Sequence, residues 1–290
     1  MNSKSKTFII LAVLFLANLL AWQSVFYYRS QSGKLEVTFL DVGQGDAIFI
    51  RTPQNHQILI DGGPDPKVLE KVAQELPFWD RDLDMIILTH PDKDHLFGLL
   101  EILKSYKVDN IVWSGINKDT DIDAEWERLK ESEISKEGAK ETDATAGQRI
   151  IAGEAVFSIL YPFGNSPTSS SGGGNEDSLA LRLDLGQNSF LFCGDIGFGE
   201  EQKMIDSKSD LAARVLKVAH HGSKNSTSEK FLQEVKPDLA IIEVGQNSYG
   251  HPSGEVLTRL SKSGINTLRT DKNGDIKIVA DGNNFSIANR

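Results

Sequence analysis

The stretch 89-THPDKDHLFG-98 places two histidines and two aspartates within six positions, directly after the apolar run 85-MIIL-88. The length and composition of that run predict a buried strand, and Pro91 cannot donate the hydrogen bond that would extend it. The next segment, 96-LFGLLEILKSY-106, has the spacing of an amphipathic helix. The four titratable side chains are therefore expected at the junction between a strand and a helix.

These side chains form two pairs, each with one imidazole and one carboxylate. His90 and Asp92 can point to the same side of an extended turn, whereas Asp94 and His95 begin the helix, with Asp94 as the expected N-cap. Such crowding is the arrangement that divalent metal ions stabilise. The structural alternative is an aspartate-rich turn that caps a helix, but it does not account for both histidines.

Further polar residues stand, like His90, at the end of apolar runs elsewhere in the chain. They are Asp61 in 58-ILIDGG-63, Asp195 in 190-FLFCGD-195 and His220 in 215-VLKVAH-220. The carboxyl ends of such strands can meet at one edge of an α/β sandwich, and a buried carboxylate is costly unless it is paired or bound to a metal. Each residue alone could be a turn former, but their recurrence predicts one shared metal site.

The composition restricts the class of protein. The 290 residues include 39% hydrophobic residues, enough for a core, and the net charge of −10 argues against a general polyanion-binding surface. Any contact with nucleic acid is therefore expected to be local. The single cysteine, Cys193, excludes an internal disulfide and a cysteine-based zinc site, and its apolar surroundings predict a buried, inert thiol.

From Leu35 onward, short β-branched or aromatic runs alternate with segments of helical spacing. This order predicts one α/β domain with two packed sheets covered by helices. Residues 117–146 are rich in charged and small polar side chains, so we interpret them as an exposed helix and loop.

The first 30 residues differ from the rest. The run 8-FIILAVLFLANLLAWQSVFYY-28 carries no charge and has about the 20 residues that a bilayer crossing requires. We expect residues 1–30 to form an uncleaved, single-pass anchor in the cell membrane, with the following domain outside the cytoplasm. A cleaved signal peptide is the alternative, although no small-residue cleavage site follows the apolar core.

The order of the motifs DGG, HxDxDH, GD and HHGS resembles that of the metallo-β-lactamase superfamily. The resemblance is closer to the extracytoplasmic hydrolase domain of ComEC-type DNA-uptake proteins, and it covers essentially residues 35–280. It implies a four-layer αβ/βα sandwich over residues 35–290. The segments that carry it are 41-DVGQGDAIFI-50, 89-THPDKDH-95, 175-NEDSLALRL-183, 194-GDI-196, 219-AHHGSKNS-226, 247-NSYGHP-252 and 269-RTDKNGDI-276.

The resemblance also implies a centre of two divalent metal ions, either zinc or manganese. The implied ligands are His90 and Asp92 for the first ion, and Asp94, His95 and His220 for the second, with Asp195 shared by both.

This ligand set has one alternative and two departures from the usual pattern of the superfamily. His221 is the alternative to His220, because it could face the ions if the segment is a turn. Asp92 stands where most members of the superfamily have a histidine, and 175-NEDS-178 stands where a third histidine is usual. The first ion therefore has fewer nitrogen ligands, which shifts the preference toward harder ions such as manganese.

The reaction implied by the resemblance is metal-dependent hydrolysis of a phosphodiester, with DNA as the expected substrate and a DNA-uptake machinery as a candidate partner. The expected catalytic residues are Asp94, His95, Asp195 and His251, and the expected phosphate-binding residues are Asn175, Ser178, Ser223, Lys224 and Asn225. Asp61 and His221 are expected to orient the metal ligands without binding an ion themselves. Hydrolysis of a lactam or thioester, or a non-catalytic binding module, are the alternatives. The sequence does not determine the oligomeric state.

Overall fold

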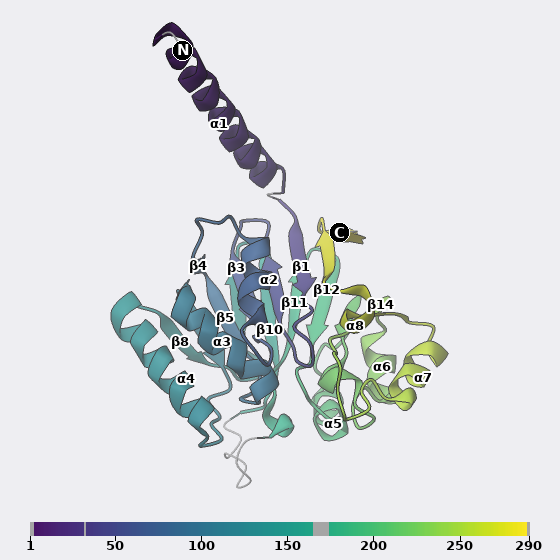
Figure 1. Cartoon of the computed structure of the whole chain (residues 1–290). Helices are drawn as coiled ribbons and strands as arrows, with labels where there is room; N and C mark the ends of the chain where they lie inside the picture. The colour runs from purple at the N-terminus through teal and green to yellow at the C-terminus, as the bar shows by residue number, and fades with distance from the viewer. Residues whose placement is uncertain (1–2, 32, 165–173, 289–290) are drawn as a thin grey trace.

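The computed structural model describes residues 3–31, 33–164 and 174–288. Two large mixed sheets organise the chain from Leu35 onward (Figure 1). The eight-stranded sheet has the order β17 (Phe285–Ala288), β16 (Ile276–Ala280), β1 (Leu35–Phe39), β2 (Ile48–Arg51), β3 (Gln57–Ile60), β5 (Met85–Leu88), β7 (Asn110–Trp113) and β8 (Lys140–Asp143). The seven-stranded sheet has the order β15 (Asn266–Arg269), β14 (Leu239–Ile242), β13 (Val215–Lys217), β12 (Asn188–Phe192), β11 (Ala180–Leu185), β10 (Ala155–Tyr161) and β9 (Arg149–Ala152).

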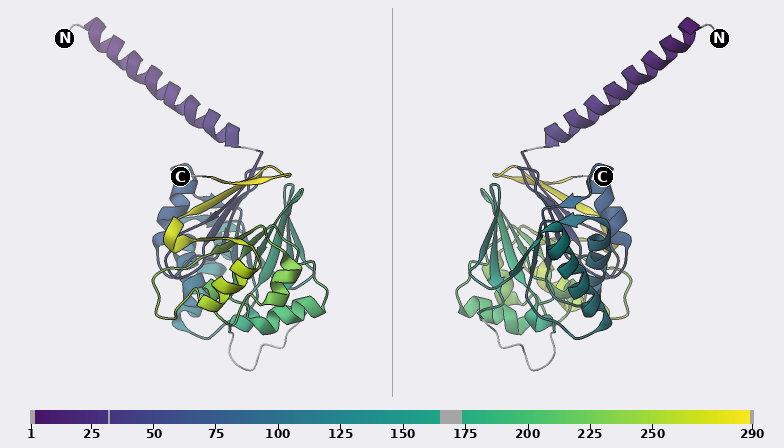
Figure 2. Two further views of the ribbon diagram at one scale, coloured as in Figure 1. Left: turned by 90° about the vertical axis from the view of Figure 1, so that its right-hand side faces the viewer. Right: turned by 90° about the vertical axis from the view of Figure 1, so that its left-hand side faces the viewer.

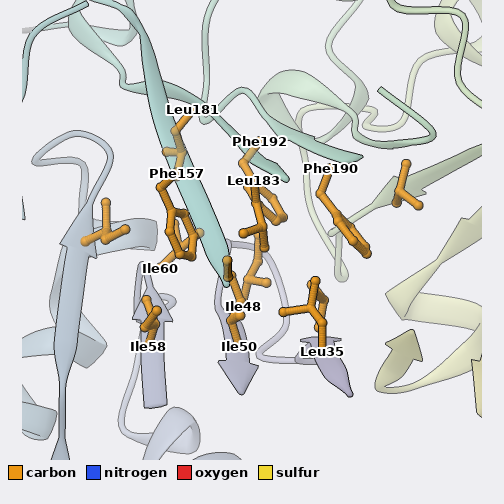
Figure 3. Close-up of a cluster of buried hydrophobic side chains, with 14 of the residues drawn as sticks. Leu35, Ile48, Ile50, Ile58, Ile60, Phe157, Leu181, Leu183, Phe190 and Phe192 are labelled. Carbon is orange, nitrogen blue, oxygen red and sulfur yellow. The ribbon is translucent and has the colours of Figure 1, made fainter. Parts of the chain in front are cut away.

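The inner faces of the two sheets pack on each other through one apolar cluster (Figure 3). Alternation along the strands produces this face, because successive side chains point to opposite sides of a sheet. In β10, for example, every second residue from Ala155 to Tyr161 is buried. The residues labelled in the close-up are Leu35, Ile48, Ile50, Ile58 and Ile60 from one sheet and Phe157, Leu181, Leu183, Phe190 and Phe192 from the other.

Helices cover the outer face of each sheet (Figures 1 and 2). A second apolar cluster joins the eight-stranded sheet to α2 (Lys67–Glu75), α3 (Lys93–Ser105) and α4 (Asp121–Ser132). A third joins the seven-stranded sheet to α5 (Phe198–Asp206), α6 (Glu229–Val235) and α7 (Gly254–Lys262). The predicted four-layer αβ/βα sandwich is therefore confirmed. The remaining elements are β4 (Asp82–Leu83), β6 (Lys107–Val108), the π-helical turn Glu133–Glu137, α8 (Thr270–Asn273) and the 3-10 turns Asn175–Asp177 and Ala219–Gly222.

Two local expectations are wrong. Helix α3 begins two residues earlier than predicted, so that Asp92 has the extended backbone of the N-cap and Asp94 lies in the first turn. Residues 117–146 are not merely a solvated insertion, because α4 buries Trp126 with its ring centroid 6.0 Å from that of Trp113. Buried Trp126 and Leu129 thus attach a charge-rich helix to the outer face of the sheet.

The expected membrane anchor is also wrong. Residues Ser3–Gln31 do form a helix, α1, but within the described part of the chain no helix combines the length and apolarity that crossing a bilayer requires. The single-pass location and the extracytoplasmic placement of the remaining chain, both inferred from that anchor, are overturned with it.

Candidate metal centre

The candidate site lies where the carboxyl ends of two pairs of parallel strands meet. Asp61 follows β3 and His90 follows β5, which pair in parallel in the eight-stranded sheet. Asp195 follows β12, and the turn Ala219–Gly222 follows β13, its parallel neighbour in the other sheet. The topology therefore brings together polar residues that are more than 150 positions apart in the sequence.

Close backbone packing at two glycines fixes the distance between strand β3 and helix α3. The amide of Gly62 donates a hydrogen bond to the carbonyl of His95 at 2.7 Å. A Cβ atom on Gly98 would lie 1.8 Å from the carbonyl oxygen of Gly62, so that only glycine permits this approach. The helix start consequently lies against the strand end, where His95 Nδ1 is 2.8 Å from Asp61 Oδ2.

The ligand atoms of the predicted residues form two adjoining groups. In one group, ligand atoms of His90, His95 and Asp195 all lie within 4.8 Å of one another, and in the other those of Asp94, His95 and His221 do so. Asp195 contacts both groups, with Oδ1 3.4 Å from His95 Nε2 and Oδ2 3.6 Å from His221 Nε2. The imidazole of His95 belongs to both groups and lies between the other two rings, 4.1 Å from His90 and 5.4 Å from His221.

The outer nitrogens of all three imidazoles are engaged with oxygen atoms of the protein. His95 Nδ1 lies 2.8 Å from Asp61 Oδ2, His90 Nδ1 lies 3.0 Å from Thr89 Oγ1, and His221 Nδ1 lies 3.0 Å from the carbonyl oxygen of Glu243. Asp61 also accepts hydrogen bonds from the amide and the hydroxyl of Thr89. These acceptors favour the proton on Nδ1, which leaves the lone pair of each Nε2 directed into the site.

The inner atoms lack hydrogen-bond partners among the described residues. They are the Nε2 atoms of His90, His95 and His221 and the Oδ1 atom of Asp195, all of them buried. Buried polar atoms without partners are rare in folded proteins because leaving them unsatisfied is costly. Lone pairs of nitrogen and carboxylate oxygen that converge in this way fit the ligand preferences of divalent ions such as Zn²⁺ and Mn²⁺.

The electrostatics of the site also favour a cation. Burial lowers the pKa of His221, but Asp195 and Asp46 outweigh that effect and raise it to about 10. Burial raises the pKa of Asp195, but the nearby imidazoles, His221 first, hold it well below its usual range. The carboxylates thus retain their negative charge in the interior, and it is balanced either by a protonated His221 or by a bound cation that replaces the Nε2 proton.

An unusual turn aims His221 at the site. His220 and His221 both have φ of +50°, and Gly222 has φ of +82°, so three consecutive residues are left-handed. Such a backbone costs on the order of 1 kcal/mol at each non-glycine residue and persists only where the surroundings fix it. Here the amide of His220 donates to the carbonyl of Gly194 and the Ser226 hydroxyl donates to the carbonyl of Ala219.

Among the described residues, two further groups of candidate ligands add Asp46, one with Asp195 and His221 and one with Asp61 and His95. Two residues of the expected ligand set lie outside all four groups. His220 is 30% exposed, and its Nε2 lies 3.7 Å from Asp195 Oδ2, whereas His221 is buried and occurs in two of the groups. Asp92 lies 3.8 Å from His90 Nε2, and its other oxygen is paired with Lys118. The geometry therefore favours His221 as the ligand of the second site and His220 as a residue at its rim, the reverse of the expected order.

The expected phosphate-binding residues divide into two sets. Asn175 lies beside the site, with its amide nitrogen 3.2 Å from His220, and the His251 ring lies 5.5 Å from that of His220. Ser178 is buried and its hydroxyl accepts a hydrogen bond from the amide of Asp195. Ser223 is buried as well and accepts from the amide of Asn225, while Lys224 is exposed. The two serines thus support loops, whereas Asn175 and the expected catalytic residue His251 lie beside His220 at the rim of the site.

Sequence reasoning missed three buried charged residues behind the site. Asp46, in the motif 43-GQGD-46, lies 3.2 Å from His221 Nδ1 and pairs with Lys217. Lys217 is 1% exposed and also donates to the carbonyl of Gly194, and Glu243 accepts from the amide of Ala47. The signal that could have found them is a lysine and a glutamate at the ends of the apolar strands β13 and β14, where an unpaired charge is costly.

The competing assignments of the two adjacent histidines make opposite predictions. We expect His221→Ala to lower the amount of divalent metal bound per chain after gel filtration, because it removes a buried nitrogen that faces Asp94 at 3.3 Å. His220→Ala should retain the metal, because that ring lies at the rim. The measurement is elemental analysis of both purified variants beside the unaltered chain. Loss of metal in His220→Ala alone would restore the order expected from the sequence.

Asp61 has a position from which it can orient a ligand without binding metal itself. Replacing it by asparagine keeps its shape but removes the charge that holds the proton on His95 Nδ1. We expect Asp61→Asn to weaken metal affinity by about 10- to 100-fold, as is usual when the partner of a ligating histidine is removed. Competition with a metal-chelating dye measures this directly, and an unchanged affinity would contradict the role.

Comparison with known proteins agrees with this geometry. Residues 40–245 match the family model described as the metallo-beta-lactamase superfamily. The chain is similar to ComE operon protein 3 of Bacillus subtilis (strain 168), with 33% identity over an alignment of 271 residues that covers 87% of this chain and 34% of that protein. It is also similar to competence protein ComA of Neisseria gonorrhoeae, with 29% identity over 269 residues, or 92% of this chain and 35% of that one. The chain thus spans about one third of the length of these curated relatives.

Among solved structures, the metallo-beta-lactamase fold protein YhfI from Bacillus subtilis superimposes with a TM-score of 0.58 at 13% sequence identity. The match covers 85% of this chain and 100% of that one. At such low identity the likeness shows the fold alone.

Proposed function

Because the chain belongs to the metallo-β-lactamase superfamily and is related to competence proteins, we propose that it is a metal-dependent phosphodiesterase that cleaves DNA. The observation that carries the proposal is the set of buried, partnerless Nε2 and carboxylate atoms that converge at one edge of the sandwich. A degenerate binding module would have no reason to keep so many costly groups facing one another. In a metal-dependent hydrolase, the same nitrogen and carboxylate atoms would be the ligands of the metal ions.

Five residues would hold the metal ions: His90, Asp94, His95, Asp195 and His221. When bound, divalent ions at such a centre lower the pKa of water and stabilise the negative charge that develops on a phosphoryl group. Asp92 is close enough to His90 to contribute to the first site once its pairing with Lys118 is exchanged. A carboxylate there in place of an imidazole favours harder ions, which makes manganese a competitor of zinc.

Asn175 and His251 are the residues proposed to contact the substrate at the opening. The Nδ1 atom of His251 is buried and has no hydrogen-bond partner among the described residues. Burial and the nearby His220 lower the pKa of His251, which favours a neutral ring that donates a hydrogen bond over an imidazolium that acts as a general acid. We therefore propose that His251 orients the phosphodiester and does not protonate the leaving oxygen.

The relationship to competence proteins supports DNA as the substrate and a DNA-uptake machinery as the setting. The test is hydrolysis by the purified chain of single-stranded DNA, RNA, a small phosphodiester, a chromogenic lactam and a thioester, each with zinc, with manganese and with a chelator. We expect DNA cleavage that depends on the ion. Ion-dependent cleavage of the lactam or the thioester alone would show that the site does not act on phosphodiesters. No hydrolysis of any substrate would indicate a binding module.

A further inference from the structure

The loop after β14 presents an exposed aromatic side chain beside the metal centre. Tyr249 is 74% exposed, and its ring centroid lies 5.8 Å from that of His251, with the two planes tilted by 31°. The ring of His251 lies 5.5 Å from that of His220, and His220 Nε2 lies 3.7 Å from Asp195 Oδ2. Two imidazole rings therefore connect the exposed tyrosine to a carboxylate of the centre.

The side chain of Asn247 fixes the conformation of this loop. Its Oδ1 atom accepts hydrogen bonds from the amides of Tyr249 at 3.1 Å and His251 at 3.0 Å. Its Nδ2 atom donates to the carbonyls of Gly245 at 2.9 Å and His251 at 2.8 Å. One amide group thus bonds to backbone atoms on both sides of Tyr249.

The ends of the loop are fastened to segments that also build the site. The amide of Gly245 donates to the side chain of Gln44, and a Cβ atom on Gly245 would lie 2.4 Å from the carbonyl carbon of Gly43. At the other end, the amide of Ser253 donates at 2.8 Å to the carbonyl of Gly222, the residue after His221. The backbone position of Tyr249 is consequently fixed relative to the candidate ligands before any substrate binds.

We propose that Tyr249 stacks on a nucleobase next to the phosphodiester in the metal centre, so that the substrate is single-stranded nucleic acid. The proposal rests on the phosphodiesterase function proposed above. An acidic chain cannot rely on broad electrostatic attraction to phosphates, and stacking on an aromatic ring accepts any base. The faces of bases in a duplex are covered by their neighbours, whereas those of a single strand are free to stack. Because the backbone of this loop is fixed before the substrate binds, the loop loses little conformational entropy on binding.

The test compares two probes at fixed salt concentration: a fluorescent oligothymidylate, and an oligomer of the same length whose sugars carry no base. We expect Tyr249→Ala to weaken binding of the oligothymidylate, and to raise the KM for its cleavage, by about 5-fold or more. Binding and cleavage of the baseless oligomer should not change. Tyr249→Trp should retain the affinity for the oligothymidylate, because it keeps an aromatic face.

Phe78→Ala is the matched control. Phe78 is also exposed and contacts an aromatic neighbour, Trp79, at 4.8 Å. It lies on a segment tied to the amino end of β3, the edge opposite to the site, because Gln57 donates to Asp80. Its loss should leave both probes unaffected.

Equal weakening of both probes by Tyr249→Ala, or no weakening of either, would overturn the stacking assignment. Binding is measured separately from cleavage, so the two proposals can fail independently. If the unaltered chain cleaves neither probe, the phosphodiesterase function fails. A base-dependent loss of binding in Tyr249→Ala would still support the subsite in that case.

Discussion

Replacing His95 by alanine is expected to eliminate divalent-dependent hydrolysis, with a loss of about a thousandfold or more. His95 contributes Nε2 to both groups of candidate ligands, and its ring lies between those of His90 and His221. Its removal would take a buried nitrogen ligand from the centre, and ions at such a centre contribute several kcal/mol to the stabilisation of the transition state. The measurement is the initial rate of hydrolysis on the best substrate of the panel, together with the metal content of the variant.

The control for this prediction is His56→Ala. His56 is a half-exposed histidine paired with Asp84, and it precedes β3, at the edge of the sheet opposite to the site. Its removal should leave the rate and the metal content unchanged. Because His95→Ala also leaves Asp61 without a partner, its circular dichroism and unfolding midpoint must be compared with those of the unaltered chain. A folded His95→Ala variant that keeps its divalent-dependent rate would contradict the metal centre.

The fold could be predicted from the sequence because strand patterns and chain order are local signals. Apolar runs such as 85-MIIL-88 became buried strands, and the polar residues after them lie at one edge, since parallel strands end together. The helix at residues 121–132 was underestimated because its many charged residues obscure the few that it buries, among them Trp126, whose partner Trp113 comes from a strand. The N-terminal run was overestimated as an anchor, because it forms a helix, α1, but no helix within the described residues combines the length and apolarity that a bilayer crossing requires.

The site could be predicted only where the ligand types and their spacing carried the information. The order of His221 and His220 depends on three left-handed residues, which no apolar or polar pattern indicates for two histidines. Asp46 was not singled out because its partner, Lys217, is 171 positions away and becomes its neighbour only when the two sheets pack. Such pairs of buried charges form only in the tertiary structure, and a sequence motif contains only one of the two residues.

That buried pair leads to the second large effect, which concerns stability. Lys217 donates to Asp46 and to the carbonyl of Gly194, and its Nζ lies 4.0 Å from Asp195 Oδ1. Burial alone would lower the pKa of Lys217, but Asp46 and Asp195 outweigh it and raise the pKa, so the ammonium stays charged in the interior. We expect Lys217→Met to reduce the free energy of unfolding by about 3–5 kcal/mol, because Asp46 would remain buried without its cation.

Urea denaturation of the metal-free chain measures this effect without a contribution from bound ions. Lys203→Met is the matched control, because Lys203 pairs with Glu200 but is 56% exposed, and such pairs contribute about 0–1 kcal/mol. The double variant Asp46→Asn with Lys217→Met should recover part of the loss, since it removes the unpaired charge as well as the ammonium. If Lys217→Met costs no more than Lys203→Met, the ammonium is not what stabilises the carboxylates behind the site, and the imidazoles of His95 and His221 alone must do so.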